Sequence, residues 1–530
     1  MKSRFAKHRT VFACLSRLIL LLTLFASPAG AQVTSKLWGV SGEAWDPEGF
    51  LKDFTDAGYM NSAAIPDRPV TTNVEDFGAD GSDDLDDTEA FRAAIRAVPE
   101  DGVIFIPNGR YIISDYIHVA AYDPDSTDRS NKFPNSPFTI FNKSNFTLRG
   151  EDMAETKIVF PQRMGEIYQR LSRPALMDYL YSNHEQFNND EFKNRFGIPL
   201  EYDFSQQGGD SDFIFIRSLQ EAIINYLAHE YSQSFTKVGS FFEFKGVTDT
   251  NIENLSFLFD DRQRWEHQEN TGGNPLSFIS ASHCYVRNVY IRNADSGIFN
   301  ERGENITFQN IILDQYRHRF EERYPTSGHN GIKMVGTSDC LVHNVWFTGP
   351  WWHAFDLNGS NSGTVLSKIK GPYLNLVYHG GYQTGNLYTD FDGDTTRFLT
   401  TGKHSLETYW GMQSPDEALT YNSPEKSAEL KDVLVGVNTT DPSELDSPDY
   451  WHETIDPEAL DPLNIYLAQM AYRSRPLPED MPFSMGMLPR ESGEPLYIFP
   501  SESPSVSSVE DKRDINFYSE SPELFDRAPN

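Results

Sequence analysis

The chain has 530 residues and a formal net charge of −32 at pH 7, from 45 Lys and Arg against 77 Asp and Glu. Nucleic-acid binding needs a basic surface, so this composition argues against DNA or RNA as a partner. The acidity fits a protein in a salty medium, where counter-ions screen its self-repulsion.

The first 31 residues have the features of a secretory signal. A basic start precedes a short apolar run over residues 18–26, and Ala29-Gly-Ala31 resembles a cleavage site. The run is too short to span a membrane, and no later run is long enough, so we expect no membrane association. We predict a secreted bacterial protein, extracellular or periplasmic, with an irregular lead-in at 32–70.

Residues 73–113 form the most informative segment of the chain. A strand ending at Phe77-Gly78 is followed by an acidic turn, and Asp86, Asp87 and Thr88 are placed to cap a helix. Phe91 and Ile95 lie on one face of that helix, and a strand then begins at Gly102. This string resembles the N-terminal segment of the pectate-lyase-like right-handed parallel β-helix superfamily of polysaccharide-degrading enzymes.

A repeated strand template supports the same all-β solenoid fold. Its asparagines stand at steps of 34, 22 and 34 residues, and a lysine follows after 24, where one coil needs roughly 22 residues. The template residues are Asn254, Asn288, Asn310, Asn344 and Lys368. We expect the asparagines to stack as an internal amide ladder with a structural role. The two longer steps predict two inserted loops.

Other segments depart from this pattern. We predict a mostly helical insertion at about 162–235 within a β-helix of residues 71–411, and a C-terminal cap and acidic tail over 412–530 with a helix near 462–472. Cys284 and Cys340 are either bridged or, in the favoured interpretation, two buried thiols.

Histidines on successive coils mark the predicted site. A histidine beside a carboxylate can transfer protons, because imidazole titrates near neutral pH. An aromatic ring can offer a flat surface to a sugar ring. We therefore select His329, His353 and His379, with Asp356, Tyr378 and Lys333 beside them and Trp351 and Trp352 as sugar platforms. The alternative is that the histidines and tryptophans are structural.

The two inserted loops concentrate positive charge in an otherwise acidic chain. An arginine guanidinium group can form paired hydrogen bonds with a carboxylate or sulfate group of a substrate. Ion pairs with neighbouring acidic residues on the surface would explain these arginines equally well. The predicted substrate-binding residues here are Arg262, Arg264, Trp265, Arg317, Arg319 and Arg323.

Hydrolysis of a glycosidic bond usually needs two carboxyl groups. The carboxylates at matching heights of the stack are Asp295, Glu301, Asp314, Asp339 and Asp356, and of these we select Asp295, Asp314 and Asp356. Asn293-Ala-Asp295, Gly328-His-Asn-Gly331 and Lys368-Ile-Lys370 partly resemble the signatures of polygalacturonase-like β-helix hydrolases, but the tandem Asp pair of those enzymes is missing between the first two, and Asn330 interrupts the second.

We expect no required cofactor. The acids Asp390, Asp392 and Asp394 alternate as in a calcium loop, and a Gly-containing turn explains them as well. No Cys/His spacing suggests zinc.

These patterns lead to three functional hypotheses. The first is an endo-acting glycoside hydrolase on an anionic polysaccharide, sulfated or uronate-containing and perhaps from marine algae, in which Asp356 shares acid and base roles with Asp295 or Asp314 and the histidines assist. The second is a polysaccharide lyase: a histidine removes the C5 proton, Tyr378 protonates the leaving oxygen and an arginine neutralises the uronate. The third is a non-catalytic glycan-binding protein.

Overall fold

A computed structural model describes residues 32–114, 137–163, 188–195, 198, 200, 203, 205, 240–260, 272–315, 328–349, 351–400, 403–413, 431–437, 450–484 and 488. Within these ranges, none of the helices is long and apolar enough to cross a membrane.

The predicted N-terminal segment folds as a strand, a short helical turn, a helix and two further strands. It comprises β1 (Val70–Asn73), η1 (Val74–Phe77), α2 (Thr88–Ala97), β2 (Gly102–Ile106) and β3 (Gly109–Ile112). Phe91 and Ile95 of α2 are buried against the first coils. The capping prediction is wrong for Asp87, whose carboxylate accepts hydrogen bonds from the backbone N–H of Asp80 and Ile112, so it ties the turn to β3.

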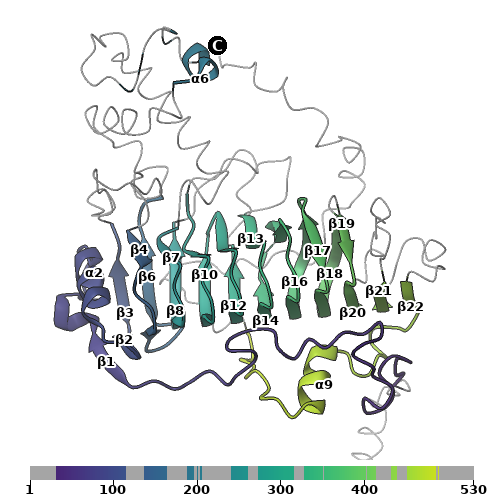
Figure 1. Ribbon diagram of the computed structural model, residues 1–530. Helices are drawn as coiled ribbons and strands as arrows, with labels where there is room; N and C mark the ends of the chain where they lie inside the picture. The colour runs from purple at the N-terminus through teal and green to yellow at the C-terminus, as the bar shows by residue number, and fades with distance from the viewer. Residues whose placement is uncertain are drawn as a thin grey trace, which may run out of the picture. The chain divides into compact units, whose positions relative to one another are not determined.

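The remaining strands are stacked coils of a parallel β-helix (Figure 1). They are β4 (Phe138–Phe141), β5 (Phe146–Gly150), β6 (Thr156–Phe160), β7 (Phe242–Lys245), β8 (Thr250–Phe259), β9 (Leu276–Ile279), β10 (Tyr285–Arg292), β11 (Ser296–Glu301), β12 (Thr307–Asp314), β13 (Gly328–Val335), β14 (Leu341–Phe347), β15 (Trp351–Asn358), β16 (Val365–Tyr378), β17 (Tyr382–Thr384), β18 (Leu387–Thr400), β19 (Lys403–Ser405), β20 (Thr408–Gln413), β21 (Asp432–Val437) and β22 (Tyr450–Glu453). Each pairs in parallel with strands of the neighbouring coils: β10, for example, pairs with β8 and β12. The predicted fold class is confirmed.

The core lies inside the coils, where aligned positions of successive strands are filled by apolar side chains. One such row runs through Leu276, Ile298, Ile332, Phe355 and Leu376, all fully buried. Burying a side chain of this size contributes roughly 1.5–3 kcal/mol, so the stack is stabilised along its whole length.

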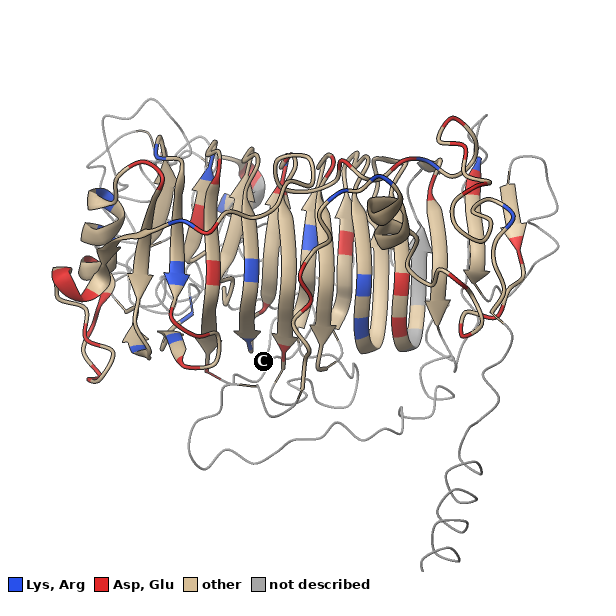
Figure 2. Cartoon of the chain, turned by 90° about the horizontal axis from the view of Figure 1, so that it is seen from below, with Lys and Arg blue, Asp and Glu red and all other residues tan. Residues whose placement is uncertain are grey.

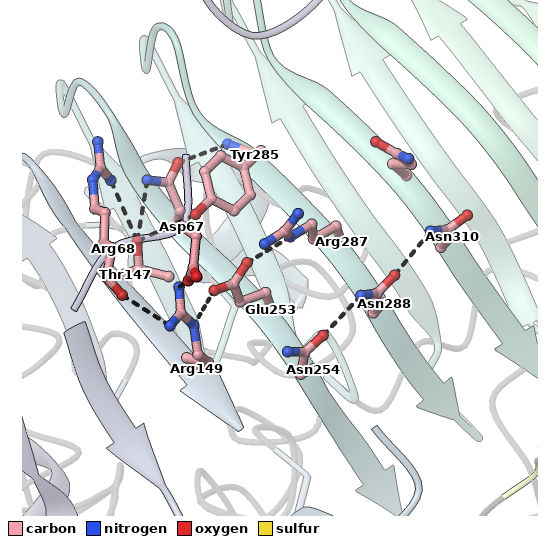
Figure 3. Close-up of polar contacts among 12 residues, drawn as sticks. Asp67, Arg68, Thr147, Arg149, Glu253, Asn254, Tyr285, Arg287, Asn288 and Asn310 are labelled. Atoms are coloured by element: carbon pink, nitrogen blue, oxygen red, sulfur yellow. Dashed lines mark hydrogen bonds and ion pairs between the residues drawn. The ribbon is translucent and has the colours of Figure 1, made fainter. Parts of the chain in front are cut away.

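The asparagine ladder forms as predicted (Figure 3). The amide of each asparagine donates to the previous one, at 2.8 Å from Asn288 to Asn254, 2.8 Å from Asn310 to Asn288 and 2.6 Å from Asn344 to Asn310. All four have φ between 53° and 58°, a left-handed conformation that asparagine tolerates better than most residues. The ladder is not internal, because Asn254 and Asn288 are only half-buried.

The two cysteines are free, buried thiols. Tyr285 aligns with Thr307 and Thr307 with Leu341, so Cys284 and Cys340 lie two coils apart in one row. Two strand spacings amount to roughly 9.6 Å, beyond the reach of a disulfide bond.

One side of the stack is covered by both ends of the described chain. The lead-in runs beneath the strands and meets α9 (Ile465–Tyr472), where Trp38 packs on Tyr472 (Figure 1). Further along, Asn310 and Asn344 donate to the carbonyls of Glu479 and Met481. These contacts cover the ladder at Asn310 and Asn344, which are buried, whereas Asn254 and Asn288 remain half-buried.

Acidic and basic residues alternate across several strands of this covered side (Figure 2). Glu253 of β8 lies between Arg149 of β5 and Arg287 of β10, and accepts hydrogen bonds from both (Figure 3). Arg149 also donates to the carbonyl of Arg68 in the lead-in and pairs with Asp67. Arg149 on this side therefore binds the lead-in through a hydrogen bond and an ion pair.

The stack continues beyond the boundary predicted at residue 411. Strand β20 pairs with β21, and β21 with β22, so parallel pairing reaches Glu453 inside the segment that we assigned to a cap. The predicted C-terminal helix corresponds to α9. In the predicted helical insertion, the structure describes α6 (Asp190–Arg195) and a few neighbouring residues. The rest of that insertion lies outside the described residues.

Candidate active site

The three predicted histidines lie on one sheet of the stack, formed by β9, β11, β13, β15 and the second half of β16, which we call the histidine sheet. His329 is on β13, His353 on β15, and His379 follows β16 directly. Their rings form a chain, with centroids 5.5 Å apart from His329 to His353 and 4.8 Å from His353 to His379. The coil spacing brings together residues that are 24 and 26 positions apart in the sequence.

A glycine shapes the strand beside these rings. A Cβ atom at Gly331 would lie 2.4 Å from the ring of Phe347 and 2.6 Å from the carbonyl of Ala354, so only glycine fits there. The absence of a side chain at Gly331 therefore lets the backbone of β13 pack directly against Phe347 and the backbone of β15. Lys333, two residues later, aligns with Asp356 on the next coil.

Asp356 connects the cluster to a lysine. Its carboxylate lies 2.6 Å from the ammonium of Lys333 through Oδ2, and 2.7 Å from Nδ1 of His379 through Oδ1. The side chain of Asp356 is 1% exposed, whereas those of Lys333 and His379 are 18% and 25% exposed. The carboxylate is thus enclosed, and its two partners reach the surface.

This environment keeps Asp356 ionised. Burial alone would raise the pKa of its carboxyl, but the charge of Lys333 and the hydrogen bond from His379 outweigh burial and hold the pKa well below its usual range. A carboxyl in that state cannot donate a proton near neutral pH. It can orient the His379 ring through Nδ1, which leaves Nε2 of His379 to exchange a proton.

The two tryptophans differ in exposure. Trp352 is half-buried, with its ring centroid 6.1 Å from that of His353, so it can offer a surface to a ligand. Trp351 is fully buried and packs against Phe347 inside the coil. The prediction that Trp351 binds a sugar face is therefore wrong, because alternate residues of a strand point to opposite faces.

Tyr378 is likewise unable to protonate a leaving group. Its side chain points into the core, where its hydroxyl is 2.9 Å from that of Tyr409 and 3.4 Å from Glu407. Burial, together with the neighbouring tyrosines and Glu407, raises the pKa of Tyr378 well above its usual value. The role that we predicted for Tyr378 is wrong for the same reason as for Trp351: its neighbour His379, and not Tyr378, lies on the outer face.

The other two candidate carboxylates are engaged in structural contacts. Asp295 is fully buried and forms a 2.8 Å ion pair with Arg163, and its second oxygen accepts a hydrogen bond from the backbone of Gly273. Asp314 is also buried and accepts hydrogen bonds from Tyr290 and Thr348. The structure does not bring either residue into an exposed pair with Asp356.

Arg262, Arg264, Trp265, Arg317, Arg319 and Arg323 all lie outside the described residues.

The predicted calcium loop is part of strand β18. Asp390 accepts a hydrogen bond from Asn464 at 3.2 Å, and Asp392 pairs with Lys370 at 3.0 Å. The side chain of Asp394 is outside the described part of the chain. In that part, no group of three or more His, Cys, Asp or Glu side chains is arranged to hold a metal ion.

Sequence reasoning did not predict that several polar atoms on the histidine sheet are buried without a hydrogen-bond partner among the described residues. They are Ser277 Oγ, Ser296 Oγ, Glu301 Oε2, Asn330 Oδ1 and Asn375 Oδ1. Buried polar atoms are normally paired with protein or water, so such a concentration indicates a place for bound water or ligand. Only the register of the coils reveals the grouping, since these residues share no motif.

Comparison with known proteins supports the fold. Residues 71–322 match the family model described as "Rhamnogalacturonase A/epimerase, pectate lyase-like". No protein of curated function matches the chain.

Among solved structures, the chain is similar to the A-module of the Azotobacter vinelandii mannuronan C-5 epimerase AlgE6, at 12% identity and a TM-score of 0.37, over 72% of this chain and 98% of that one. It is also similar to a family 28 exopolygalacturonase of Yersinia enterocolitica, at 12% identity and a TM-score of 0.33, over 74% and 69% of the two chains. The family match covers residues 71–322, a little less than half of the chain, and the parallel coils of the structure agree with the pectate-lyase-like fold that the family description names.

Proposed function

We propose that the protein is a secreted enzyme that acts on a uronate-containing polysaccharide and moves a proton at C5, the carbon next to the uronate carboxylate. The observation that carries this proposal is the Lys333–Asp356–His379 cluster, in which a buried, ionised carboxylate orients a partly exposed histidine. The description of the matching family, which names a rhamnogalacturonase and an epimerase, supports a polysaccharide substrate.

Each member of the cluster has a role in this chemistry. Nδ1 of His379 is held by Asp356, so Nε2 is the atom that removes the proton. The negative charge that then develops on the uronate carboxylate needs a cation, and Lys333 is the nearby basic residue that reaches the surface. In this proposal His353, whose ring adjoins that of His379, gives a proton to the leaving oxygen or back to the carbon.

Proton removal at C5 leads to two related outcomes. Loss of the oxygen at C4 gives chain cleavage with an unsaturated uronate, as in a lyase. Return of a proton to the opposite face of C5 inverts that centre, as in an epimerase. Both begin with the same base and the same neutralised carboxylate, so the cluster serves either reaction.

Hydrolysis is the second candidate, favoured by the word rhamnogalacturonase in the family description. An endo-acting hydrolase was our first hypothesis from the sequence. It needs two carboxyl groups facing the scissile bond, one of them protonated. Asp295 and Asp314 are buried in other contacts, and Asp356 stays ionised, so none of the three fits the acid role in this arrangement.

One experiment separates these outcomes. The purified protein is incubated with pectic, alginate and ulvan polysaccharides while reducing ends and the ultraviolet absorbance of unsaturated uronates are followed together, and solvent deuterium at C5 is measured by NMR. We expect deuterium incorporation at C5, unsaturated products, or both. New reducing ends without either signal would establish a hydrolase and overturn the proposal.

The His379→Ala variant assigns the chemistry to the cluster. We expect it to lose both C5 signals, whereas His283→Ala, a histidine on a turn of another coil, serves as the matched control and keeps them.

A further inference from the structure

His379 lies at the end of a short strand pairing. β13 and β15 pair over most of their length, whereas the described strands β15 and β16 are in register at only three pairs, the last of which joins Leu357 to Tyr378. The backbone N–H of His379 then donates to the carbonyl of Leu357 at 3.1 Å. Because so short a pairing constrains the end of the strand weakly, the position of His379 also depends on the turn that follows it.

That turn lies directly on the corresponding turn of the preceding coil. A Cβ atom at Gly381 would lie 1.8 Å from the carbonyl oxygen of Gly359 and 2.1 Å from its carbonyl carbon. These are backbone atoms, which cannot rotate away as the end of a side chain would. The φ of Gly381 is 76°, a conformation that also favours glycine. Only glycine at position 381 therefore allows the two turns to pack this closely.

Hydrogen bonds join the same two turns beside this contact. The side-chain amide of Gln383 donates to the carbonyl of Gly359 at 2.8 Å. The backbone N–H of Tyr382 donates to Oγ of Ser360 at 3.3 Å. A side chain at position 381 would push the turns apart and stretch both hydrogen bonds, so the glycine contact and these bonds form one unit.

We propose that Gly381 is a positioning residue for the reaction, because its contact with Gly359 brings two coils close enough for Asp356 to hold the ring of His379. Asp356 precedes Gly359 by three residues, and His379 precedes Gly381 by two. The separation of the turns therefore sets the 2.7 Å distance between Oδ1 of Asp356 and Nδ1 of His379. This inference rests on the proposed function for the role of His379, and it assigns the alignment of that ring to backbone packing.

The test compares Gly381→Ala with Gly385→Ala as its matched control. Gly385 has a φ of 65°, and a Cβ atom there would meet no described atom within 4 Å. Both variants carry the strain of a left-handed alanine, but only Gly381→Ala adds the collision. Thermal unfolding checks that each variant is folded. If Gly381→Ala does not fold, Gly359→Ala replaces it, since its Cβ would lie 3.1 Å from the backbone nitrogen of Gly336 and shift the same turn more gently.

We expect Gly381→Ala to lower kcat roughly 10–100-fold with little change in KM, because the substrate still binds but the base is misaligned. Gly385→Ala should keep the wild-type kcat. In an Asp356→Asn background, Gly381→Ala should cause little further loss, because the contact that it positions is already gone. Losses that add in the double variant would show that Gly381→Ala distorts the protein generally, and would overturn the inference.

A measurement without substrate separates this result from a failure of the proposed function. The ¹⁵N chemical shifts of labelled histidine rings, recorded at alkaline pH, report which nitrogen carries the proton, and the loss of a signal in His379→Ala identifies His379. We expect the proton on Nδ1, facing Asp356, in the wild type and in Gly385→Ala, and a mixture of tautomers in Gly381→Ala. If this change occurs but no protein shows activity at C5, the positioning role stands and the proposed reaction is wrong. Wild-type tautomers in Gly381→Ala would refute the positioning role.

Discussion

Glu407 offers a quantitative test of how burial sets charge in this fold. Its carboxyl is fully enclosed by the last coils, where it accepts hydrogen bonds from Asn386 and Tyr388. Asp432 lies beside it and pairs with His404 at 3.1 Å. Burial first, and then the charge of Asp432, raise the pKa of Glu407 from 4.5 to about 8.

This shift makes the stability of the fold depend on pH. The folded protein keeps a proton on Glu407 up to about pH 8, whereas the unfolded chain releases it near pH 4.5. The stabilisation is therefore fully present below pH 4.5 and is lost as the pH rises toward 8. At about 1.36 kcal/mol for each unit of pKa, the loss from this one group amounts to about 5 kcal/mol.

The variant Glu407→Gln isolates the effect, because an amide has the same shape as the protonated acid and cannot ionise. Urea unfolding of both proteins from pH 5 to pH 9 gives the two free-energy curves. Over this range we expect the wild type to lose about 4 kcal/mol relative to the variant, because part of the loss falls below pH 5. Glu304→Gln, at an exposed turn residue, should follow the wild type. Parallel curves for the wild type and Glu407→Gln would refute the reasoning.

Three further substitutions test the site and its framework. Asp356→Asn removes the carboxylate that orients His379, and we expect turnover measured by steady-state kinetics to fall about 10²–10⁴-fold. The control Asp392→Asn, which removes one partner of an exposed ion pair, should leave turnover unchanged. Asp295→Ala leaves a buried arginine unpaired and should cost about 3–5 kcal/mol of stability, measured by urea unfolding; a loss below 1 kcal/mol would contradict the buried pair. Asn310→Ala removes a link of the asparagine ladder and its hydrogen bonds to Glu479 and Met481. We therefore expect limited proteolysis to cut the chain near residues 479–481 faster in this variant than in the wild type. Equal cleavage rates would show that these hydrogen bonds do not hold the C-terminal segment in place.

Much of the fold could be predicted because its signals are local and repeated. A left-handed backbone position recurs once in each coil, and asparagine occupies it in four successive coils, so the spacing of Asn254, Asn288, Asn310 and Asn344 reports the coil length directly. The apolar residues on either side of each asparagine indicate which side chains fill the core. The pattern repeats because every coil needs a residue that tolerates the left-handed conformation and apolar residues that fill the core at the same positions.

The site was only partly predictable from the same data. The sequence indicated that His329, His353 and His379 occur on successive coils, and the structure confirms that their rings are adjacent. It did not indicate that Trp351 and Tyr378 point inward, because a shift of one residue in a strand exchanges the two faces.

The sequence by itself determined the class of fold, the length of its coil and the approximate position of the histidines, because strand periodicity and turn residues are properties of short segments. Only the tertiary structure decided that Asp356 is an orienting carboxylate rather than an acid, since its charge depends on Lys333 and His379 from other coils. Burial, pairing and charge arise between coils, and no local pattern in the chain records them.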